Sequence, residues 1–236
     1  IVMVTKIKSP SPLFILYGSA TGNSEQIAKN LSVEYNKMLT SNKDGCYFPE
    51  VICCELDQYK KKCIKSWEDD AGLNNEINQR HGVLIVTTAT GNGEFPENAS
   101  RITKYVKRKT TVETMPFEHV AYAVLGLGDT NYDQFCGAGK LIDRKLNDLG
   151  GTRIKGIACA DEGTGLEQVV DPWIKNIIFV VSEGCQGKQR PQDDKKSSGK
   201  AEEEKSSDNL PTSKSSVAQT NPLVESSSHL KCTMSE

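Results

Sequence analysis

The chain alternates short apolar runs with segments whose apolar residues recur every three or four positions. Apolar runs of strand length lie at residues 14–16, 82–86 and 120–125, and residues 50–56 and 154–160 have a similar character. Helical spacing of apolar residues occurs at 27–38, 99–106, 141–149 and 166–177. Strands that alternate with helices predict an α/β fold. We expect a five-stranded parallel sheet in the order 2-1-3-4-5, with helices on both of its faces.

Three stretches fall outside this alternation. Residues 60–80 are polar and weakly periodic, so we expect an irregular excursion before the strand at 82–86. We expect residues 1–12 to form an N-terminal extension and residues 13–182 to form the folded domain. Residues 183–236 are rich in Ser, Lys, Glu and Gln and have almost no aromatic side chain, which predicts a disordered polar segment. This segment is either an interdomain linker or a solvated C-terminal tail.

Composition narrows the classes of protein to consider. A net charge of −2 and a pI of about 6.0 give no sign of a nucleic-acid-binding protein. No stretch approaches the roughly 18 apolar residues of a membrane span, although the chain begins at Ile1 rather than Met, so an earlier anchor or targeting segment stays open. The eight cysteines lack a C-x-x-C pair or zinc-like spacing. They predict reduced thiols and a cytoplasmic location rather than a disulfide framework.

The most informative loop is residues 18–25, GSATGNSE, which follows an apolar run and opens a helix. Its hydroxyls, its amides and the helix N-terminus together suit a terminal phosphate. No Lys follows the second glycine and no G-x-G-x-x-G occurs, so it is neither a Walker loop nor a dinucleotide fingerprint. The alternative is an ordinary capped turn, because Ser, Thr and Asn commonly cap helices.

Two further polar loops follow later apolar runs, TTATGNGEFP at residues 87–96 and GLGDTNYDQFC at residues 126–136. All three loops lie at the carboxyl ends of predicted parallel strands, where open α/β sheets bind ligands. In this order and spacing they resemble the FMN domain of the diflavin reductases, and the resemblance covers residues 13–180. It implies a flavodoxin-like three-layer sandwich with FMN as its cofactor.

The resemblance also implies which residues bind the cofactor, and it implies no catalytic side chain and no metal ligand. The phosphate would be bound by Ser19, Ala20, Thr21, Gly22, Asn23 and Ser24. The flavin ring would lie between two further groups of residues: Thr88, Ala89, Thr90 and Gly91 on one side, and Leu127, Gly128, Asp129, Thr130, Asn131, Tyr132, Asp133, Gln134, Phe135 and Cys136 on the other. Asp161 and Glu162 would lie beside the ring.

Several of these residues carry a more specific expectation from the family. Tyr132 would stack on the ring, the alternative being a loop tyrosine packed on the domain surface. Thr90 stands where many relatives have an aromatic residue, which leaves that side of the ring less covered. The peptide at Gly91 can reorient, so that its carbonyl accepts a hydrogen bond from N5–H of the reduced ring. Asp161 and Glu162 either lower the reduction potential or are solvated carboxylates at a helix start.

Residues 160–173 and 139–146 most resemble the methionine synthase reductase family. In that family NADPH reduces FAD on a second domain, FAD reduces FMN, and FMN reactivates the oxidised cobalamin of methionine synthase. The resemblance implies these partners for a monomeric protein, with FAD and NADPH bound outside this chain. Acidic residues at 94, 97, 129 and 133 would rim the site and favour a basic partner. The alternatives are an FMN module that serves a hemoprotein, as in a cytochrome P450 reductase or another diflavin reductase, and a stand-alone flavodoxin-like carrier.

Overall fold

The structure, a computed structural model, describes residues 9, 11–41, 46–64 and 79–186, so most of the predicted polar segment lies outside the described residues. Its sheet has the order β2-β1-β3-β4-β5, with β6 also paired to β4, and every pair is parallel. This confirms the predicted order. The strands are β1 (Leu13–Gly18), β2 (Val51–Glu55), β3 (His81–Thr88), β4 (Val120–Gly128), β5 (Thr152–Arg153) and β6 (Ala158–Asp161).

The last predicted strand, residues 154–160, differs in the structure: residues 154–157 lie in no strand, and they separate β5, which ends at Arg153, from β6, which begins at Ala158. Tyr122 of β4 pairs with Arg153, and Leu125 pairs with Ala158. Two residues of β4, 123 and 124, therefore lie opposite the four residues 154–157. Because four residues cannot pair with two, this segment bulges out of the sheet. Ile154 lies there against α6 (Glu167–Cys185), since a Cβ added at Gly184 would clash with its Cγ2 atom.

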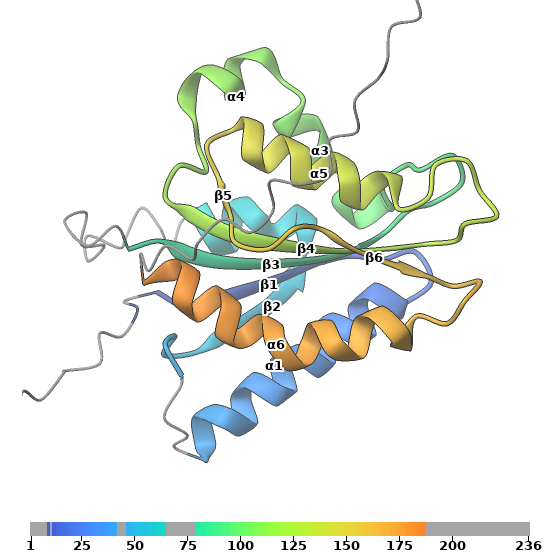
Figure 1. Cartoon of the computed structure of the whole chain (residues 1–236). Coiled ribbons are helices and arrows are strands. Elements are labelled where there is room, and N and C mark those ends of the chain that lie inside the picture. The colour runs from blue at the N-terminus through green and yellow to red at the C-terminus, as the bar shows by residue number, and fades with distance from the viewer. Residues whose placement is uncertain (1–8, 10, 42–45, 65–78, 187–236) are drawn as a thin grey trace, which may run out of the picture. The chain divides into compact units, whose positions relative to one another are not determined.

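Helices cover both faces of the sheet, as predicted (Figure 1). Helices α1 (Asn23–Thr40) and α6 lie on one face, and α6 extends to Cys185, past residue 182. The other face carries α3 (Ser100–Val106), α4 (Lys109–Thr114) and α5 (Gly137–Asp148). Short helical turns connect these elements: η1 (Leu56–Gln58), η2 (Lys60–Ile64) and η4 (Glu97–Ala99).

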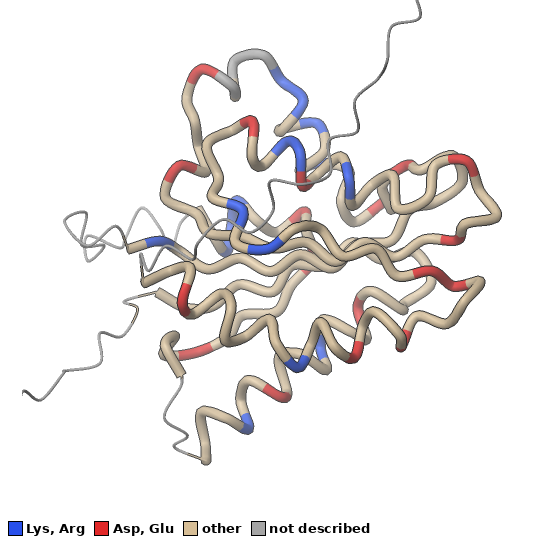
Figure 2. Tube along the Cα trace, in the orientation of Figure 1, with Lys and Arg blue, Asp and Glu red and all other residues tan. Residues whose placement is uncertain are grey.

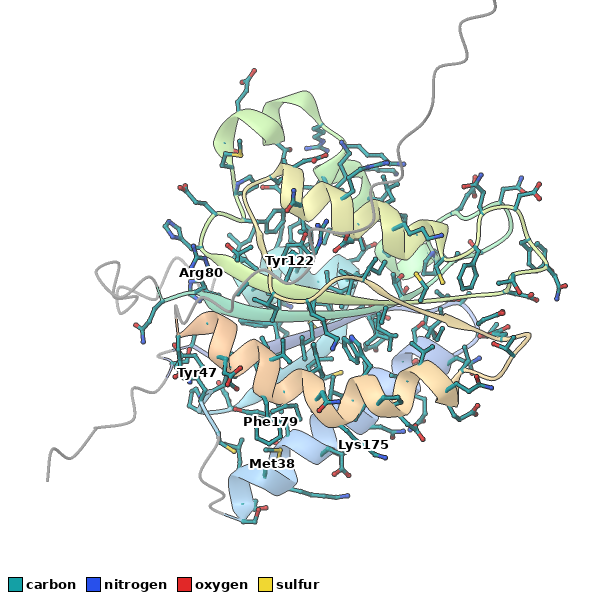
Figure 3. All side chains as sticks on the ribbon, in the orientation of Figure 1. Met38, Tyr47, Arg80, Tyr122, Lys175 and Phe179 are labelled. Carbon is teal, nitrogen blue, oxygen red and sulfur yellow. The ribbon has the colours of Figure 1, made fainter. Side chains whose placement is uncertain are left out.

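Alternate residues of the central strands supply two separate cores. Leu13 and Ile15 of β1 face α1 and α6, whereas Phe14 and Leu16 face the layer of α3 and α5. In Figure 3, Tyr122 is labelled on the side of α3 and α5, and Met38 and Phe179 are labelled on the side of α1 and α6. Because both faces are covered, the central strands are buried along their whole length, and only their ends are open to a ligand.

Tyr35 joins α1 to the segment that precedes β2. Its side chain is fully buried, and its hydroxyl donates to the carbonyl oxygen of Phe48 at 3.0 Å and accepts from the Phe48 amide at 2.9 Å. Burial raises the pKa of this phenol well above its usual range, so the hydroxyl stays protonated. One side chain thus satisfies both backbone polar groups of a buried residue.

Replacing Tyr35 with Phe should therefore lower the free energy of unfolding by about 2–4 kcal/mol, because two buried backbone groups lose their partner. Chemical denaturation would measure the change. Tyr132→Phe is the matched control, since Tyr132 is 60% exposed and its hydroxyl should contribute little to stability. Equal stabilities for the two variants would contradict this role of Tyr35.

Candidate functional site

The carboxyl ends of four strands meet at one edge of the sheet (Figure 1). Gly18 pairs with Thr87, Thr88 with Leu127, and Gly128 with Asp161, so these strands end at one level. The three loops predicted from the sequence leave the sheet there, and so does the Asp161–Glu162 pair. The structure thus brings together all four segments that carry the predicted site residues.

The first loop closes on itself before α1 begins. Ser19 Oγ accepts a hydrogen bond from the Gly22 amide at 3.0 Å, and Gly22 has a φ of 98°, a conformation that favours glycine. The Ser19 amide donates to Oδ1 of Asn98 at 3.0 Å. Asn98 therefore ties this loop to η4, a link that sequence reasoning missed because no motif marks that residue.

The start of α1 has unused hydrogen-bond donors. Among the described residues no side chain caps this helix, and its first internal bond runs from the Gln26 amide to the Gly22 carbonyl at 2.8 Å. The amides of Asn23, Ser24 and Glu25 precede that bond, so the helix offers them no acceptor. The Ser24 side chain is 0% exposed, and its hydroxyl has no hydrogen-bond partner within the described residues. These neutral donors fit an anion that binds at the helix start.

The second loop is a closed turn. The amides of Thr90 and Glu94 each donate to the other residue's carbonyl at 2.9 Å, and Thr90 Oγ1 donates to the Glu94 carbonyl at 3.3 Å. Gly91 and Gly93 have φ values of 47° and 82°, which favour glycine at the tip. A Cβ at Gly91 would meet nothing within 4 Å, so the Gly91 peptide borders open space.

The third loop exposes Tyr132 to solvent and is held by hydrogen bonds to Asp129 and Asp161, which together form its frame. Asp129 provides the first part, because its carboxylate accepts from the Asn131 amide at 2.8 Å and its carbonyl from the Tyr132 amide at 3.1 Å. Among the large hydrophobic side chains of the described residues, Tyr132 has the largest exposed fraction, 60%. Its ring thus offers an aromatic surface beside the strand ends.

Asp161 provides the second part of that frame. Its carboxylate accepts from the Thr130 hydroxyl at 2.8 Å, from the Thr130 amide at 3.0 Å and from the Gly163 amide at 3.0 Å. The Thr130 hydroxyl and then its amide hold the pKa of this carboxyl below its usual range. The hydrogen-bonding capacity of Asp161 is therefore largely used within the protein. Glu162 is exposed and accepts from Asn23 Nδ2 at 3.2 Å, which links it to the first loop.

The second and third loops are packed against each other through small residues. A Cβ added at Gly93 would lie 2.6 Å from Gln134 Cβ, and one added at Gly137 would lie 3.0 Å from Gly93 Cα. Phe135 lies under Lys140, whose Nζ is 5.1 Å from the ring centroid. Close glycine contacts thus fix the distance between the two loops.

The predicted site residues differ in their solvent exposure. Ala20, Thr21, Asn23, Gly91, Thr130, Asn131, Tyr132, Asp133, Gln134 and Glu162 are exposed, and Ser19, Gly22, Thr88, Ala89, Thr90, Gly128, Asp129 and Phe135 are partly buried. The side chains of Ser24, Leu127, Cys136 and Asp161 are buried. Leu127 belongs to the core, so its side chain does not face the strand ends.

The charge of this edge is acidic. The three loops contain no Lys or Arg, whereas Glu94, Asp129 and Asp133 lie within them and Glu97 and Glu162 lie beside them. Figure 2 shows Asp and Glu along these loops and most Lys and Arg elsewhere, many of them in the layer of α3, α4 and α5. An anion here must therefore be bound by amides and hydroxyls, and the rim suits a basic partner.

Residues 9, 11–41, 46–64 and 79–186 contain no group of three His, Cys, Asp or Glu side chains placed to hold a metal ion. None of the helices described there has the length and apolar character needed to cross a membrane.

Replacing Asp161 with Asn should loosen the third loop, because an amide side chain cannot accept all of these hydrogen bonds. We expect several-fold faster hydrogen exchange at the Thr130 and Gly163 amides, with no change in the central strands. Glu162→Gln is the control, since its side-chain oxygen can still accept from Asn23. Unchanged exchange at Thr130 in the Asp161 variant would contradict this role.

The same loop should respond to acid in the unmodified protein. Because the folded pKa of Asp161 lies below the ordinary value of about 4, its stabilising effect is complete above pH 4 and is lost as the pH falls through the lower folded value. Exchange at Thr130 measured at decreasing pH, corrected for the intrinsic rate, would show this loss. The Asp161→Asn variant should show no such dependence.

Comparisons with known proteins agree with this architecture. Residues 52–173, slightly more than half of the chain, match the Flavodoxin family. The chain is 41% identical over 164 residues to methionine synthase reductase of Bos taurus, which is 69% of this chain and 20% of that protein. It is 31% identical over 167 residues to NADPH-dependent diflavin oxidoreductase 1 of Xenopus laevis, 70% of this chain and 24% of that protein. The chain thus spans about a fifth to a quarter of these relatives.

A solved short-chain flavodoxin associated with a bacterial microcompartment has the same fold. It superposes with a TM-score of 0.51 at 16% identity, over 74% of this chain and 99% of the flavodoxin. The sheet order, the position of the loops and the family match lead to one conclusion: the chain belongs to the flavodoxin family.

Proposed function

We propose that this chain is the FMN-binding electron-transfer module of an NADPH-dependent diflavin reductase. A flavodoxin domain implies FMN binding, and the two relatives above are reductases of much greater length. FAD and NADPH would bind to parts of such a protein that this chain does not contain. When bound, FMN supplies a ring that takes up electrons from one partner and releases them singly to another.

The observation that carries this proposal is the set of unused donors at the start of α1. The buried hydroxyl of Ser24 and the amides of Asn23 and Glu25 would bind the phosphate, together with residues 19–22. A buried hydroxyl without a partner is costly, so an anion acceptor at this place would remove that cost. The absence of Lys and Arg from the loop is compatible with this, because a helix start binds anions through its amides.

The other loops would hold the flavin ring. Tyr132 offers an exposed aromatic face at a low entropic cost, and we propose that it stacks on the ring. Residues 88–91 would border the opposite side, where the open Gly91 peptide can present its carbonyl. The pairing of Thr90 with Glu94 keeps that segment in one shape. Asp161 would act on the ring by orienting the Tyr132 loop, as well as through its charge.

For the electron acceptor we propose the cobalamin of methionine synthase. The support is the higher identity to methionine synthase reductase, 41%, than to the diflavin oxidoreductase, 31%. The acidic rim suits a basic docking surface on the acceptor. We further propose that the module works as a monomer in the cytoplasm, since Cys53, Cys54, Cys63, Cys136, Cys159 and Cys185 are thiols without a disulfide among the described residues, which suits a reducing compartment.

Replacing Ser24 with Ala tests the phosphate site. It should weaken FMN binding about tenfold or more, because a charge-assisted hydrogen bond contributes roughly 1.5–3 kcal/mol. Without FMN its stability should stay equal or rise, since an unpaired buried hydroxyl is removed. Fluorescence titration with FMN and thermal unfolding would measure the two effects.

Ser182→Ala is the matched control for that substitution. Ser182 is also buried, but its hydroxyl donates to the Ile178 carbonyl at 2.7 Å within α6. This variant should lose stability and bind FMN as tightly as the unmodified protein. Unchanged FMN affinity in the Ser24 variant would contradict the assignment of the phosphate site.

The acceptor can be tested with the FMN-loaded chain after chemical reduction. Under anaerobic conditions, it should reduce the oxidised cobalamin of methionine synthase at least about tenfold faster than a cytochrome P450, a difference of about 1.4 kcal/mol in barrier. Stopped-flow absorbance would follow each acceptor. Faster reduction of the hemoprotein would instead favour a cytochrome P450 reductase-like module.

A further inference from the structure

Two cysteines from distant parts of the sequence lie together behind the third loop. Cys136 ends that loop, has a φ of 54° and immediately precedes α5. Its side chain is fully buried. Cys159 lies on β6 and is partly exposed. The proposed function uses neither thiol.

The sheet register places the two side chains on the same face. Cys159 pairs with Gly126 of β4, and paired residues of neighbouring strands point to the same side of a sheet. A Cβ added at Gly126 would lie 3.3 Å from Cys136 Cβ and 3.6 Å from its Sγ. Cys136 Sγ is also 3.8 Å from the carbonyl oxygen of Ala160, the residue after Cys159. The Cys136 sulfur thus lies directly against β6 beside Cys159.

The surroundings of Cys159 favour its thiolate. The Cys136 thiol lies within hydrogen-bonding reach of Cys159 and can donate its single proton either to that sulfur or to the Ala160 carbonyl. Donation from Cys136 has the largest effect and lowers the pKa of Cys159, although burial raises it. The positive charge of Lys140 lowers this pKa further, while Asp143 raises it. The first turn of α5 lies on this face of β4 too, since a Cβ at Gly139 would be 2.9 Å from Gly126 Cα. A helix start and a nearby cation both stabilise a thiolate.

Other cysteines of the described residues lack this environment. Burial raises the pKa of Cys53 and of Cys54 to about 11, and it raises those of Cys63 and Cys185 as well. Cys53 is the most useful comparison, because it is partly exposed like Cys159 but has no depressed pKa. Exposure alone therefore does not distinguish Cys159, whereas its neighbours do.

We propose that Cys159 is a site of oxidation by hydroperoxides and that Cys136 is its resolving thiol. The Cys159 thiolate attacks the peroxide, the O–O bond breaks, and the sulfur keeps one oxygen as a sulfenic acid while the rest leaves as an alcohol or water. Cys136 sulfur then attacks the Cys159 sulfur, the S–O bond breaks, and that oxygen leaves as water with the Cys136 proton. Overall the two thiols lose two electrons and two protons to the peroxide.

The disulfide would connect β6 to the end of the third loop. It would fix Cys136 at the residue where the loop passes into α5, next to the frame that Thr130 and Asp161 provide. The oxidation itself needs no flavin. It therefore stands or fails independently of the proposed function.

The test is to treat the reduced full chain, without added FMN, with one equivalent of hydrogen peroxide and to analyse it by mass spectrometry. The intact protein should lose the mass of two hydrogen atoms. Trypsin digestion should give a cross-link between peptides 110–140 and 156–175, which contain Cys136 and Cys159 as their only cysteines. Added thiol should reverse both changes.

Two variants assign the roles of the thiols. In Cys136→Ser the sulfenic acid of Cys159 should persist and be trapped by dimedone, and in Cys159→Ser dimedone should not label Cys136. Cys53 serves as the internal control and should stay unlabelled throughout. Labelling of Cys53 to the same extent as Cys159, or a sulfenic acid on Cys159 without the cross-link in the unmodified protein, would overturn the proposal. Circular dichroism would confirm that each variant is folded.

Discussion

The unused hydrogen-bonding capacity at the start of α1 is the constraint around which the site is arranged. Every helix begins with amides that have no acceptor within the helix, and here no described side chain supplies one. Ser24 adds a buried hydroxyl that also has no hydrogen-bond partner among the described residues. A protein tolerates such groups where a ligand completes their hydrogen bonds.

The neighbouring loops are fixed by hydrogen bonds within the protein. Asn98 holds the amide of Ser19, and Asp161 holds Thr130, so the first and third loops each depend on a side chain from another segment. The closed turn between Thr90 and Glu94 needs no such help. The Asp161 carboxylate therefore holds the third loop in place through hydrogen bonds, in addition to placing a negative charge at this edge of the sheet.

The fold could be predicted from the sequence because apolar runs of strand length alternate with helical spacing along most of residues 13–182. Tyr35 shows this well: helical spacing placed it on the buried face of α1. The division of the last strand could not be predicted, because it depends on the register against β4 at residues 122–125. The edge that carries the site could also be predicted, since parallel strands end at one level.

Individual side-chain contacts at that edge of the sheet could not be predicted from the sequence. Asn98 lies far along the chain from Ser19, and no local pattern connects them. Asp161 was expected beside the cofactor, but no sequence pattern near it predicts its hydrogen bonds with Thr130. The pairing of Cys159 with Gly126, which brings two cysteines together, likewise depends on the fold. The assignment of FMN-binding residues stays a prediction.

Parallel titrations of the unmodified protein with FMN and with riboflavin would test the phosphate site most directly. Riboflavin has the same ring without the phosphate, so the ratio of the two affinities isolates the contribution of the α1 start. Several charge-assisted hydrogen bonds should make FMN bind at least about a hundredfold more tightly, which is about 2.7 kcal/mol. Equal affinities for the two flavins would contradict a phosphate site at this helix.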